Sequence, residues 1–277
     1  ITVLKNGKTG INTNNPLAML HVRDSSVIFT GPTILPGPAN PPVNGAGTRM
    51  MWYADKAAFR AGAILGTQWD KDSIGLRSVA MGADTKAKGF SSTALGSSTN
   101  AIGVASTALG LGNSALGSAT TAMGQSSKAI GNISTSMGNL TTARSDQSTT
   151  MGNNTIARAF ASLVIGRFND TTTQIPSLFN WFDADPVFVI GNGSANNARK
   201  NAITILKNGK TGINTNNPIA MLHVKDSSVL FTGVQANLPP NLGPPPASGP
   251  GARMMWYPGK SAFRVGQVDG PEWNRVT

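Results

Sequence analysis

A small residue recurs every seven positions through the middle of this chain, and this period limits what the chain can fold into. Two positions before each of these residues stands a second small residue, from Ala80 to Val164. A period of seven is typical of a coiled coil, but glycine inside a helix costs roughly 1 kcal/mol, and only one regular apolar position occurs per heptad. The period therefore favours short strands of a stacked β-solenoid, in which glycine permits each turn. The recurring positions are Gly82, Gly89, Gly96, Gly103, Gly110, Gly117, Gly124, Gly131, Gly138, Ser145, Gly152, Ala159 and Gly166.

The same segments resemble a known repeat. Val79-Ala80-Met81-Gly82, Thr93-Ala94-Leu95-Gly96, Asn100-Ala101-Ile102-Gly103 and Ser114-Ala115-Leu116-Gly117 are similar to the SxAxG repeats of YadA-like heads in trimeric autotransporter adhesins. The resemblance covers about residues 78–166. It implies a left-handed parallel β-roll with coils of two heptads, and three chains packed about one axis.

The repeat has departures. Lys88, Arg144 and Arg158 stand at the normally apolar position, and Ser145 and Ala159 replace glycine. These residues predict either irregular last coils or coils whose cations face solvent.

The two ends of the chain are near-duplicates. Residues 1–31 recur at 203–233 with four substitutions, RMMWY recurs at 49–53 and 253–257, and AFR recurs at 58–60 and 262–264. Two proline-rich stretches of different length, 32–48 and 234–252, interrupt the match. A shared frame with one variable insert indicates a scaffold that presents a surface loop. The segment 188–193, followed by 202–214, Pro218 and a Leu-His-Val strand, resembles modules of bacterial surface fibres and phage-type tail fibres.

These repeats predict an all-β chain with four parts. Residues 1–75 form a β-rich flanking module, 76–166 the YadA-like β-roll, 167–202 a junction, and 203–277 the second flanking module. We expect Phe179, Trp181 and Phe182 of the junction to seal the end of the roll, because an open solenoid end needs a cap.

The flanks carry local signals as well. Asn6-Gly7 and Asn208-Gly209 predict tight hairpin turns between short strands. Asn15-Pro16 and its copy predict the start of one helical turn. The strands expected in the first copy are 19–22, 27–30, 50–53 and 58–60.

Aromatic residues beside arginine are the candidate ligand contacts, because such a set can stack on sugar rings or bind anionic groups. The alternative is that they form the core of a small β module. The set comprises Trp52, Tyr53, Arg60 and Trp69, with the copies Trp256, Tyr257, Arg264 and Trp273.

Other constellations point to structure rather than chemistry. His21 and His223 are the only histidines, they occupy the same position in two copies, and the chain has no cysteine, so we expect no metal or cofactor site. A threefold ring of these histidines around an ion is the alternative. The pairs Asp183 with Asp185 and Asp70 with Asp72 are expected in turns, since glycosidase carboxylates must face each other across a substrate.

Charge and composition exclude two further classes. The formal net charge of +11 is spread thinly along the chain, without the basic cluster and stacking aromatics of a nucleic-acid groove. Only 13% of the residues are charged and one glutamate occurs, which counts against a helix-rich enzyme. No apolar run approaches the length that spans a bilayer, so any membrane anchor is expected outside this segment.

The function predicted from these observations is attachment rather than catalysis. The chain is expected to be a homotrimeric adhesin fibre on the outside of a bacterial cell, with a surface glycan or an extracellular protein as ligand. The alternative is a receptor-binding tail fibre of a phage or a phage-like injection particle. In both, threefold symmetry would add weak contacts through avidity.

Overall fold

The computed structural model describes residues 1–32, 37–172, 176–232 and 244–273. It divides into two compact units, 1–225 and 226–277, which are treated separately below. Regular structure in the described ranges is almost entirely β-strand, with three short 3-10 helices, so the predicted all-β class is confirmed.

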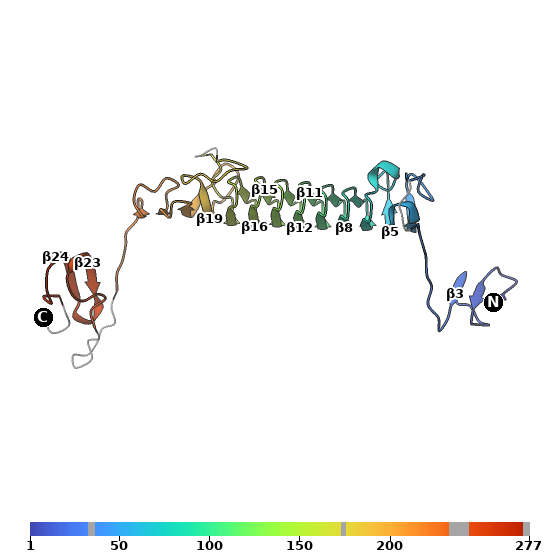
Figure 1. Cartoon of the computed structure of the whole chain (residues 1–277), viewed down its shortest axis with the longest axis horizontal. Helices are drawn as coiled ribbons and strands as arrows, with labels where there is room; N and C mark the ends of the chain where they lie inside the picture. The colour runs from blue at the N-terminus through green and yellow to red at the C-terminus, as the bar shows by residue number, and fades with distance from the viewer. Residues whose placement is uncertain (33–36, 173–175, 233–243, 274–277) are drawn as a thin grey trace. The chain divides into compact units, whose positions relative to one another are not determined.

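The centre of the first unit is a parallel β-roll, visible as the row of short coils in Figure 1. One face consists of five-residue strands in register, so that Ala94 pairs with Ala80 on one side and Ala108 on the other. The opposite face is a sheet of two-residue strands. The long strands are β6 (Val79–Ala83), β8 (Thr93–Ser97), β10 (Thr107–Leu111), β12 (Thr121–Gln125), β14 (Thr135–Asn139), β16 (Thr149–Asn153) and β18 (Leu163–Arg167). The short strands are β7 (Lys86–Ala87), β9 (Asn100–Ala101), β11 (Ser114–Ala115), β13 (Lys128–Ala129), β15 (Thr142–Ala143) and β17 (Ile156–Ala157).

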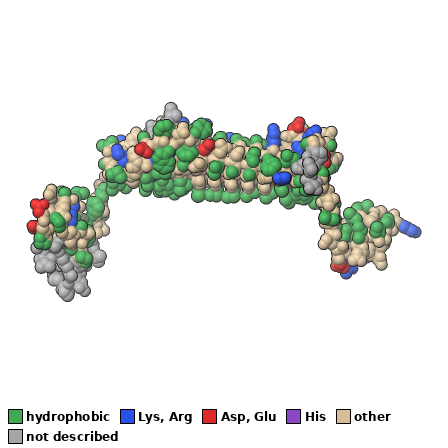
Figure 2. Space-filling model, viewed as in Figure 1, with side chains coloured by type: hydrophobic (Ala, Val, Ile, Leu, Met, Phe, Trp, Pro, Cys, Tyr) green, Lys and Arg blue, Asp and Glu red, His purple; other side chains and the backbone are tan. Residues whose placement is uncertain are grey.

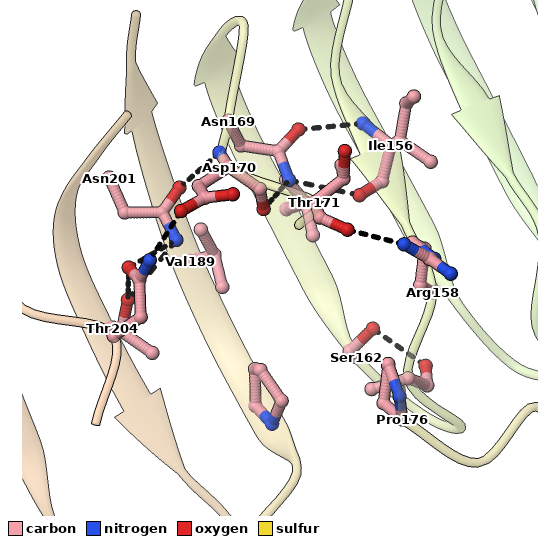
Figure 3. A pocket seen from close by; sticks show the side chains of 14 residues that line it. Ile156, Arg158, Ser162, Asn169, Asp170, Thr171, Pro176, Val189, Asn201 and Thr204 are labelled. Carbon is pink, nitrogen blue, oxygen red and sulfur yellow. Dashed lines mark hydrogen bonds between the residues drawn. The ribbon is translucent and has the colours of Figure 1, made fainter. Parts of the chain in front are cut away.

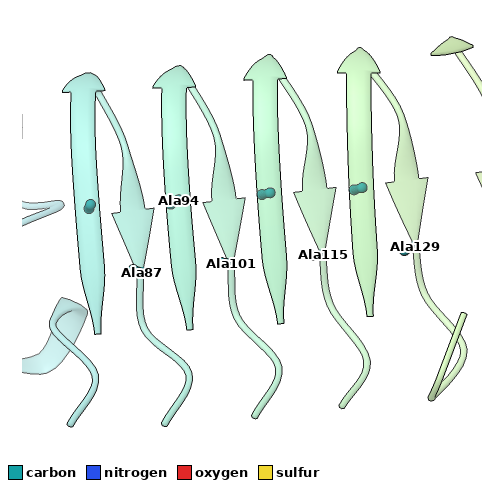
Figure 4. Close-up of a cluster of buried hydrophobic side chains, with 8 residues drawn as sticks. Ala87, Ala94, Ala101, Ala115 and Ala129 are labelled. Carbon is teal, nitrogen blue, oxygen red and sulfur yellow. The ribbon is translucent and has the colours of Figure 1, made fainter. Parts of the chain in front are cut away.

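Alanine fills the interior of the roll because the two sheets are too close for larger side chains. Ala94 and Ala108 of the long strands and Ala101 and Ala115 of the short strands are fully buried. They form one line of methyl groups along the roll (Figure 4). The predicted solenoid is confirmed, and each coil contains two heptads, one for each sheet.

Buried hydroxyl groups complete the interior at one corner of each coil. Ser92 Oγ donates to the backbone oxygen of Gly89 at 2.7 Å, and Ser106 Oγ donates to that of Gly103 at the same distance. Ser134 repeats the contact with Gly131 at 2.6 Å. A short hydroxyl side chain thus adds a hydrogen bond to a turn carbonyl, which in Gly89 and Gly103 also accepts a longer bond of 3.3 Å from the backbone N of the same serine.

The glycines of both sheets lie against the next coil, and those of the long strands also have a positive φ. Gly110 of β10 has φ +108°, and a Cβ there would lie 2.3 Å from the backbone oxygen of Gly124. Gly103, beside a short strand, would place a Cβ 1.8 Å from the oxygen of Gly117. Adjacent coils approach too closely for any side chain at either position.

The departures from the repeat are tolerated. Lys88 and Arg144 are exposed and Arg158 is half-buried, while the parallel pairing continues through β15, β17 and β18. Ser145 is buried and its Oγ donates to the oxygen of Ala159 at 2.6 Å. Lys88 and Arg144 therefore face solvent, as the second of the two predictions requires, whereas the Arg158 guanidinium donates to the backbone oxygen of Thr171.

The first long strand of the roll is covered by a hairpin. Strands β4 (Gly47–Tyr53) and β5 (Ala58–Ile64) are antiparallel and are joined by the 3-10 helix η1 (Ala54–Lys56). β5 then pairs in parallel with β6, with Phe59 opposite Val79. A second 3-10 helix, η2 (Lys71–Ser73), leads into the first coil.

The last coil is closed by strands, and the prediction that junction aromatics seal it is wrong. β19 (Pro186–Asn192) continues the sheet in parallel with β18, and β20 (Asn201–Leu206), β21 (Thr211–Ile213) and β22 (Leu222–Val224) follow at its edge. Phe179, Trp181 and Phe182 are exposed. Their segment runs along the side of the roll, where Phe160 N donates to the oxygen of Ser177. The physical reason is that β19 already supplies backbone partners to the last long strand.

The first 32 residues form a separate small sheet. β1 (Thr2–Val3) and β2 (Thr9–Ile11) make the predicted hairpin, with Gly7 at φ +83°, and β3 (Leu20–Val22) pairs in parallel with β2. The helical turn predicted at Asn15-Pro16 is wrong. Side chains take the backbone groups instead, since Thr13 Oγ1 accepts from Asn15 N and His21 Nδ1 accepts from Leu17 N. The strand predicted at 27–30 is also wrong, because these residues pair with no strand in the described part of the chain.

The second unit contains one described hairpin. β23 (Gly251–Tyr257) and β24 (Ala262–Val268) are antiparallel, and the 3-10 helix η3 (Pro258–Lys260) joins them. The register matches that of β4 and β5 residue for residue. The proline-rich stretches of both copies lie partly outside the described residues.

Candidate functional site

The interior of the roll is filled by small buried side chains, so its outer faces are the candidate sites. Along the long-strand sheet the residue after each buried inward-facing residue, which is alanine in the first four strands, points outward and is large and apolar. Met81, the first of these side chains, is 43% exposed, and Leu95 and Leu109 are partly exposed. We call this set the apolar row: Met81, Leu95, Leu109, Met123, Met137, Met151 and Ile165.

The apolar row is continuous. The in-register pairing places Leu95 beside Leu109 and Leu109 beside Met123. In Figure 2, hydrophobic side chains form an unbroken band along the edge of the roll at which Figure 1 labels β8, β12 and β16. A continuous exposed apolar surface of this kind indicates an interaction surface.

The short-strand sheet presents a different face. The equivalent outward positions hold both cations and apolar side chains: Lys88, Ile102, Leu116, Ile130, Arg144 and Arg158. Leu116 is exposed, but Lys88 and Arg144 interrupt the row at its two ends. The outward rows of the two sheets therefore differ in polarity: the apolar row holds only apolar side chains, although polar residues such as Thr107 and Gln125 flank it on the same face.

Three of the four aromatic and arginine candidates in the first copy are buried together. Tyr53 and Trp69 belong to a cluster with Met51, Ala58 and Ile64. Trp69 Nε1 donates to the backbone oxygen of Thr85 at 2.9 Å, inside the first coil. These side chains are positioned as the core of the hairpin that covers the roll.

Arg60 lies at the centre of this contact. It is 0% exposed, and its guanidinium donates to the backbone oxygens of Ser78 and Ala87 and to Ser78 Oγ. Burial lowers its pKa to about 10, so it stays charged at neutral pH. The buried guanidinium therefore fills the end of the roll and also supplies hydrogen bonds to backbone oxygens there.

Lys56 also contributes to the contact between the hairpin and the first coil. Lys56 Nζ donates to the backbone oxygen of Ile74 at 2.6 Å, and burial lowers the pKa of this amine. The Tyr53 hydroxyl, whose pKa is raised by burial and then by Asp55, donates to the oxygen of Ala39. The polar atoms of the buried candidates are thus directed at backbone oxygens of this chain.

The remaining candidates are more accessible. Trp52, on the outer face of β4, is 36% exposed. In the second copy Tyr257 is buried, whereas Trp256, Arg264 and Trp273 are partly exposed. Contact of these residues with a ligand stays a prediction.

The histidines and the aspartate pairs occupy local structural positions. His223 Nδ1 accepts from Ile219 N at 3.5 Å, as His21 Nδ1 does from Leu17 N at 3.3 Å. Asp185 Oδ2 accepts from Ser177 N at 3.1 Å and lies 4.0 Å from Lys207 Nζ. Asp70 Oδ1 accepts from Gly45 N at 2.7 Å. Within the described ranges no three His, Asp or Glu side chains are grouped so that they could hold a metal ion.

A pocket lined by both apolar and polar side chains lies where the last coil meets β19 and β20, and sequence reasoning did not identify it (Figure 3). Asp170 N donates to Asn201 Oδ1 at 2.8 Å, Asn201 Nδ2 donates to Asn216 Oδ1 at 2.8 Å, and Asn216 Nδ2 donates to Asp170 Oδ2 at 2.7 Å. Asn169 Oδ1 accepts from Ile156 N, and Asn169 Nδ2 donates to the backbone oxygen of Ile156. These amide and carboxylate groups form a closed ring of hydrogen bonds at the end of the roll. The residues of the ring come from distant segments with no shared motif, so no sequence pattern could have identified them.

Comparison with known proteins agrees with the geometry of the roll. Residues 73–127 match the YadA head domain repeat, in three overlapping stretches, 73–99, 87–113 and 101–127. The resemblance seen in the SxAxG-like segments is therefore confirmed over these coils. Searches of curated proteins and of solved structures gave no significant match. In the described residues no helix is long and apolar enough to cross a membrane.

Proposed function

We propose that this chain is a segment of a trimeric, cell-surface attachment fibre of the autotransporter adhesin type. The single observation that carries the proposal is the apolar row on the long-strand face of a roll that matches the YadA head repeat. Three copies would place their apolar rows around a common axis and leave the short-strand faces to solvent. The roll would then be left-handed, as the resemblance implies.

Physical considerations support association. A roll filled by alanine and hydroxyl side chains buries little apolar surface per chain, and narrow domains of this kind gain stability by oligomerisation. The chain also lacks cysteine, so no disulfide can substitute for that burial. Association along the apolar row would supply the missing hydrophobic free energy.

Attachment follows from the same architecture. A stack of identical coils sets a fixed length, and three copies present each outer contact three times, which raises overall affinity through avidity. We propose a surface glycan or an extracellular protein as the ligand, and no catalytic role. The proposed location is outside the cell, with any anchor in another part of the protein.

Light scattering on residues 1–277 at several concentrations tests the trimer. The expected mass is that of three chains. Leu109→Asp places a carboxylate in the middle of the apolar row and is expected to reduce the mass or prevent folding. Leu116→Asp makes the same change on the short-strand face and is expected to leave the mass unchanged. A folded monomer for the unmodified chain, or an unchanged trimer for Leu109→Asp, contradicts the proposed axis.

Binding of the trimer to an array of glycans and matrix proteins tests attachment. A trimer that binds none of these surfaces, and whose immobilised form does not hold cells, contradicts the adhesive function while leaving the assembly intact.

A further inference from the structure

The two copies of the duplicated hairpin have nearly the same fold but different exposure. In the first copy, Ala58, Arg60, Ile64 and Trp69 are buried because β5 lies against β6. The equivalent residues Ala262, Arg264, Val268 and Trp273 are all partly exposed. In the described residues β24 pairs with β23 alone, so the edge that β5 uses to bind the roll is open in the second copy.

The open edge is shaped for a strand that approaches closely. Gly62 has φ +133°, and a Cβ there would lie 2.0 Å from the backbone oxygen of Gly82 in the first coil. Gly266 has the same conformation, with φ +135°, yet a Cβ there would meet only Trp273 atoms, at 3.8 Å and beyond. In the described residues of its unit, Gly266 thus keeps the conformation of Gly62 but has no backbone close to the place of a Cβ.

Apolar side chains of the second copy are left uncovered on the same strand. Phe263 is 62% exposed and Val265 is 67% exposed, whereas Phe59 and Ala61 of the first copy are partly covered. Arg253 stacks on Trp273 at 5.6 Å as Arg49 does on Trp69 at 5.5 Å, so the second copy has the internal contacts of the first. What differs is that, among the described residues of this unit, no coil lies against β24.

We propose that β24 is the docking edge for the first coil of a further β-roll. The occupant is a strand of the β6 type, with a small inward residue followed by an apolar residue and glycine. The first copy in this same chain shows that pairing: Phe59 N donates to the oxygen of Ser78 at 3.0 Å, and Arg60 enters the coil. In the second copy Phe263 N and Arg264 take these roles.

The other half of the duplicated segment gives the same contrast at the opposite end of a roll. Residues 203–206 lie in β20, which pairs with β19, and Thr204 and Leu206 are buried. The copies of these residues, Thr2 and Leu4, are only partly buried, and β1 pairs with β2 alone in the described residues. The duplicated segment is thus a joint: its first half closes the end of one roll, and its second half opens the next.

The joint explains why a proline-rich insert divides each copy. The insert connects an element that belongs to one roll with an element that belongs to another, and proline-rich segments act as stiff spacers. A change in its length, as between 32–48 and 234–252, alters the spacing of rolls without altering either docking surface. This inference does not depend on the adhesive function or on the trimer.

An extended chain tests the proposal. Residues 74–277 are added after Thr277, so that the second hairpin precedes a second copy of the roll, as the first hairpin precedes the first. Hydrogen exchange at the amide of Phe263 is compared between the original and the extended chain. We expect exchange to slow at least tenfold in the extended chain, to the level of Phe59, because the amide gains the appended copy of Ser78 as its acceptor.

Two variants separate docking from a general effect. Arg264→Ala is expected to lower the melting temperature of the second roll in the extended chain and to change little in the original chain. Gln267→Ala is the matched control, because the first copy already has Ala63 at that position. Unchanged exchange at Phe263 beside a folded second roll overturns the proposal. A second roll that fails to fold overturns it too, since the same coils fold behind the first hairpin.

Discussion

The guanidinium of Arg60 donates to both the backbone oxygen and the Oγ of Ser78, at 2.9 and 2.8 Å, inside the first coil of the roll. Ser78 Oγ in turn donates to the oxygen of Gly75 at 2.6 Å, the corner contact that every later coil repeats. The arginine thus joins the covering hairpin to the hydrogen-bond pattern of the roll. Arg60 thus supplies hydrogen bonds to the first coil of the roll, which has no coil before it to pair with.

Replacement of this arginine should destabilise the fold. Arg60→Ala removes the donors from three buried acceptors and leaves a cavity, so we expect the free energy of unfolding to fall by about 3 kcal/mol. Denaturant unfolding at one fixed chain concentration measures the change. Arg144→Ala, which removes an exposed arginine from the short-strand face, is the control and should change stability by less than about 0.5 kcal/mol. Equal effects for the two variants would show that Arg60 does not hold the end of the roll.

The close approach of adjacent coils makes a second prediction. Gly110→Ala would place a Cβ 2.3 Å from the oxygen of Gly124 at a φ that side chains rarely adopt, so we expect a loss of about 3 kcal/mol or more. Gly112→Ala is the matched control two residues away. Its Cβ would have no neighbour closer than 3.5 Å, and Ala105 and Ala119 already adopt the same left-handed conformation at this corner. Thermal melts should rank Gly110→Ala far below Gly112→Ala, which costs about 1 kcal/mol.

Periodicity alone predicted a β-solenoid, because the alternation of small inward and large outward residues is a local property of each heptad. Ala94 and Leu95 lie on opposite faces as the pattern requires. The two sheets could not be told apart in this way, since Gly103 and Gly110 share one position of the period but differ in φ. Which glycine needs a positive φ depends on the neighbouring coil.

The ends of the roll were less predictable because they depend on contacts between distant residues. Trp69 and Arg60 were recognised as a set, but only pairing of β5 with β6 decides that they are buried. The amide ring of Asn201, Asn216 and Asp170 joins segments without a shared motif. The near-identity of the two copies also concealed their different surroundings, since Arg60 and Arg264 both follow Ala-Phe in the sequence.

The buried side chain of Lys207 should make the stability of the fold depend on pH. Its side chain is removed from solvent, 4.6 Å from the ring of Trp181 and 4.0 Å from Asp185 Oδ2, and its Nζ has no hydrogen-bond acceptor in the described part of the chain. Burial lowers its pKa from the ordinary value of 10.5, and Asp185 opposes this by a smaller amount. Between the lowered pKa and 10.5 the unfolded chain binds more protons than the folded chain, so this group adds stability as pH rises.

Lys207→Met removes that contribution. At neutral pH we expect the variant to lie within about 1 kcal/mol of the unmodified chain, because loss of the cation–π contact is offset by the burial of an apolar side chain. As pH rises toward 10.5 the unmodified chain should gain stability relative to the variant. Lys5→Met, at the exposed equivalent position in the first copy, should show no such trend. A parallel pH profile for Lys207→Met and the unmodified chain would refute the assigned burial.

One corner residue of the roll is unsuited to its backbone conformation. Each heptad places one residue in the left-handed region, and at residue 133 this is the β-branched Ile133, with φ +56°. A β-branched side chain there costs roughly 1–2 kcal/mol, whereas asparagine adopts the conformation readily, as Asn154 does at another corner. Ile133 is 60% exposed, so its replacement loses little buried surface. Ile133→Asn should therefore raise the free energy of unfolding by about 1 kcal/mol and the melting temperature with it. Val104→Asn replaces an exposed β-branched residue at a corner where φ is not positive, and should give no increase. If both variants melt alike, the left-handed corner at 133 is not strained, and the solenoid accepts any side chain at that position.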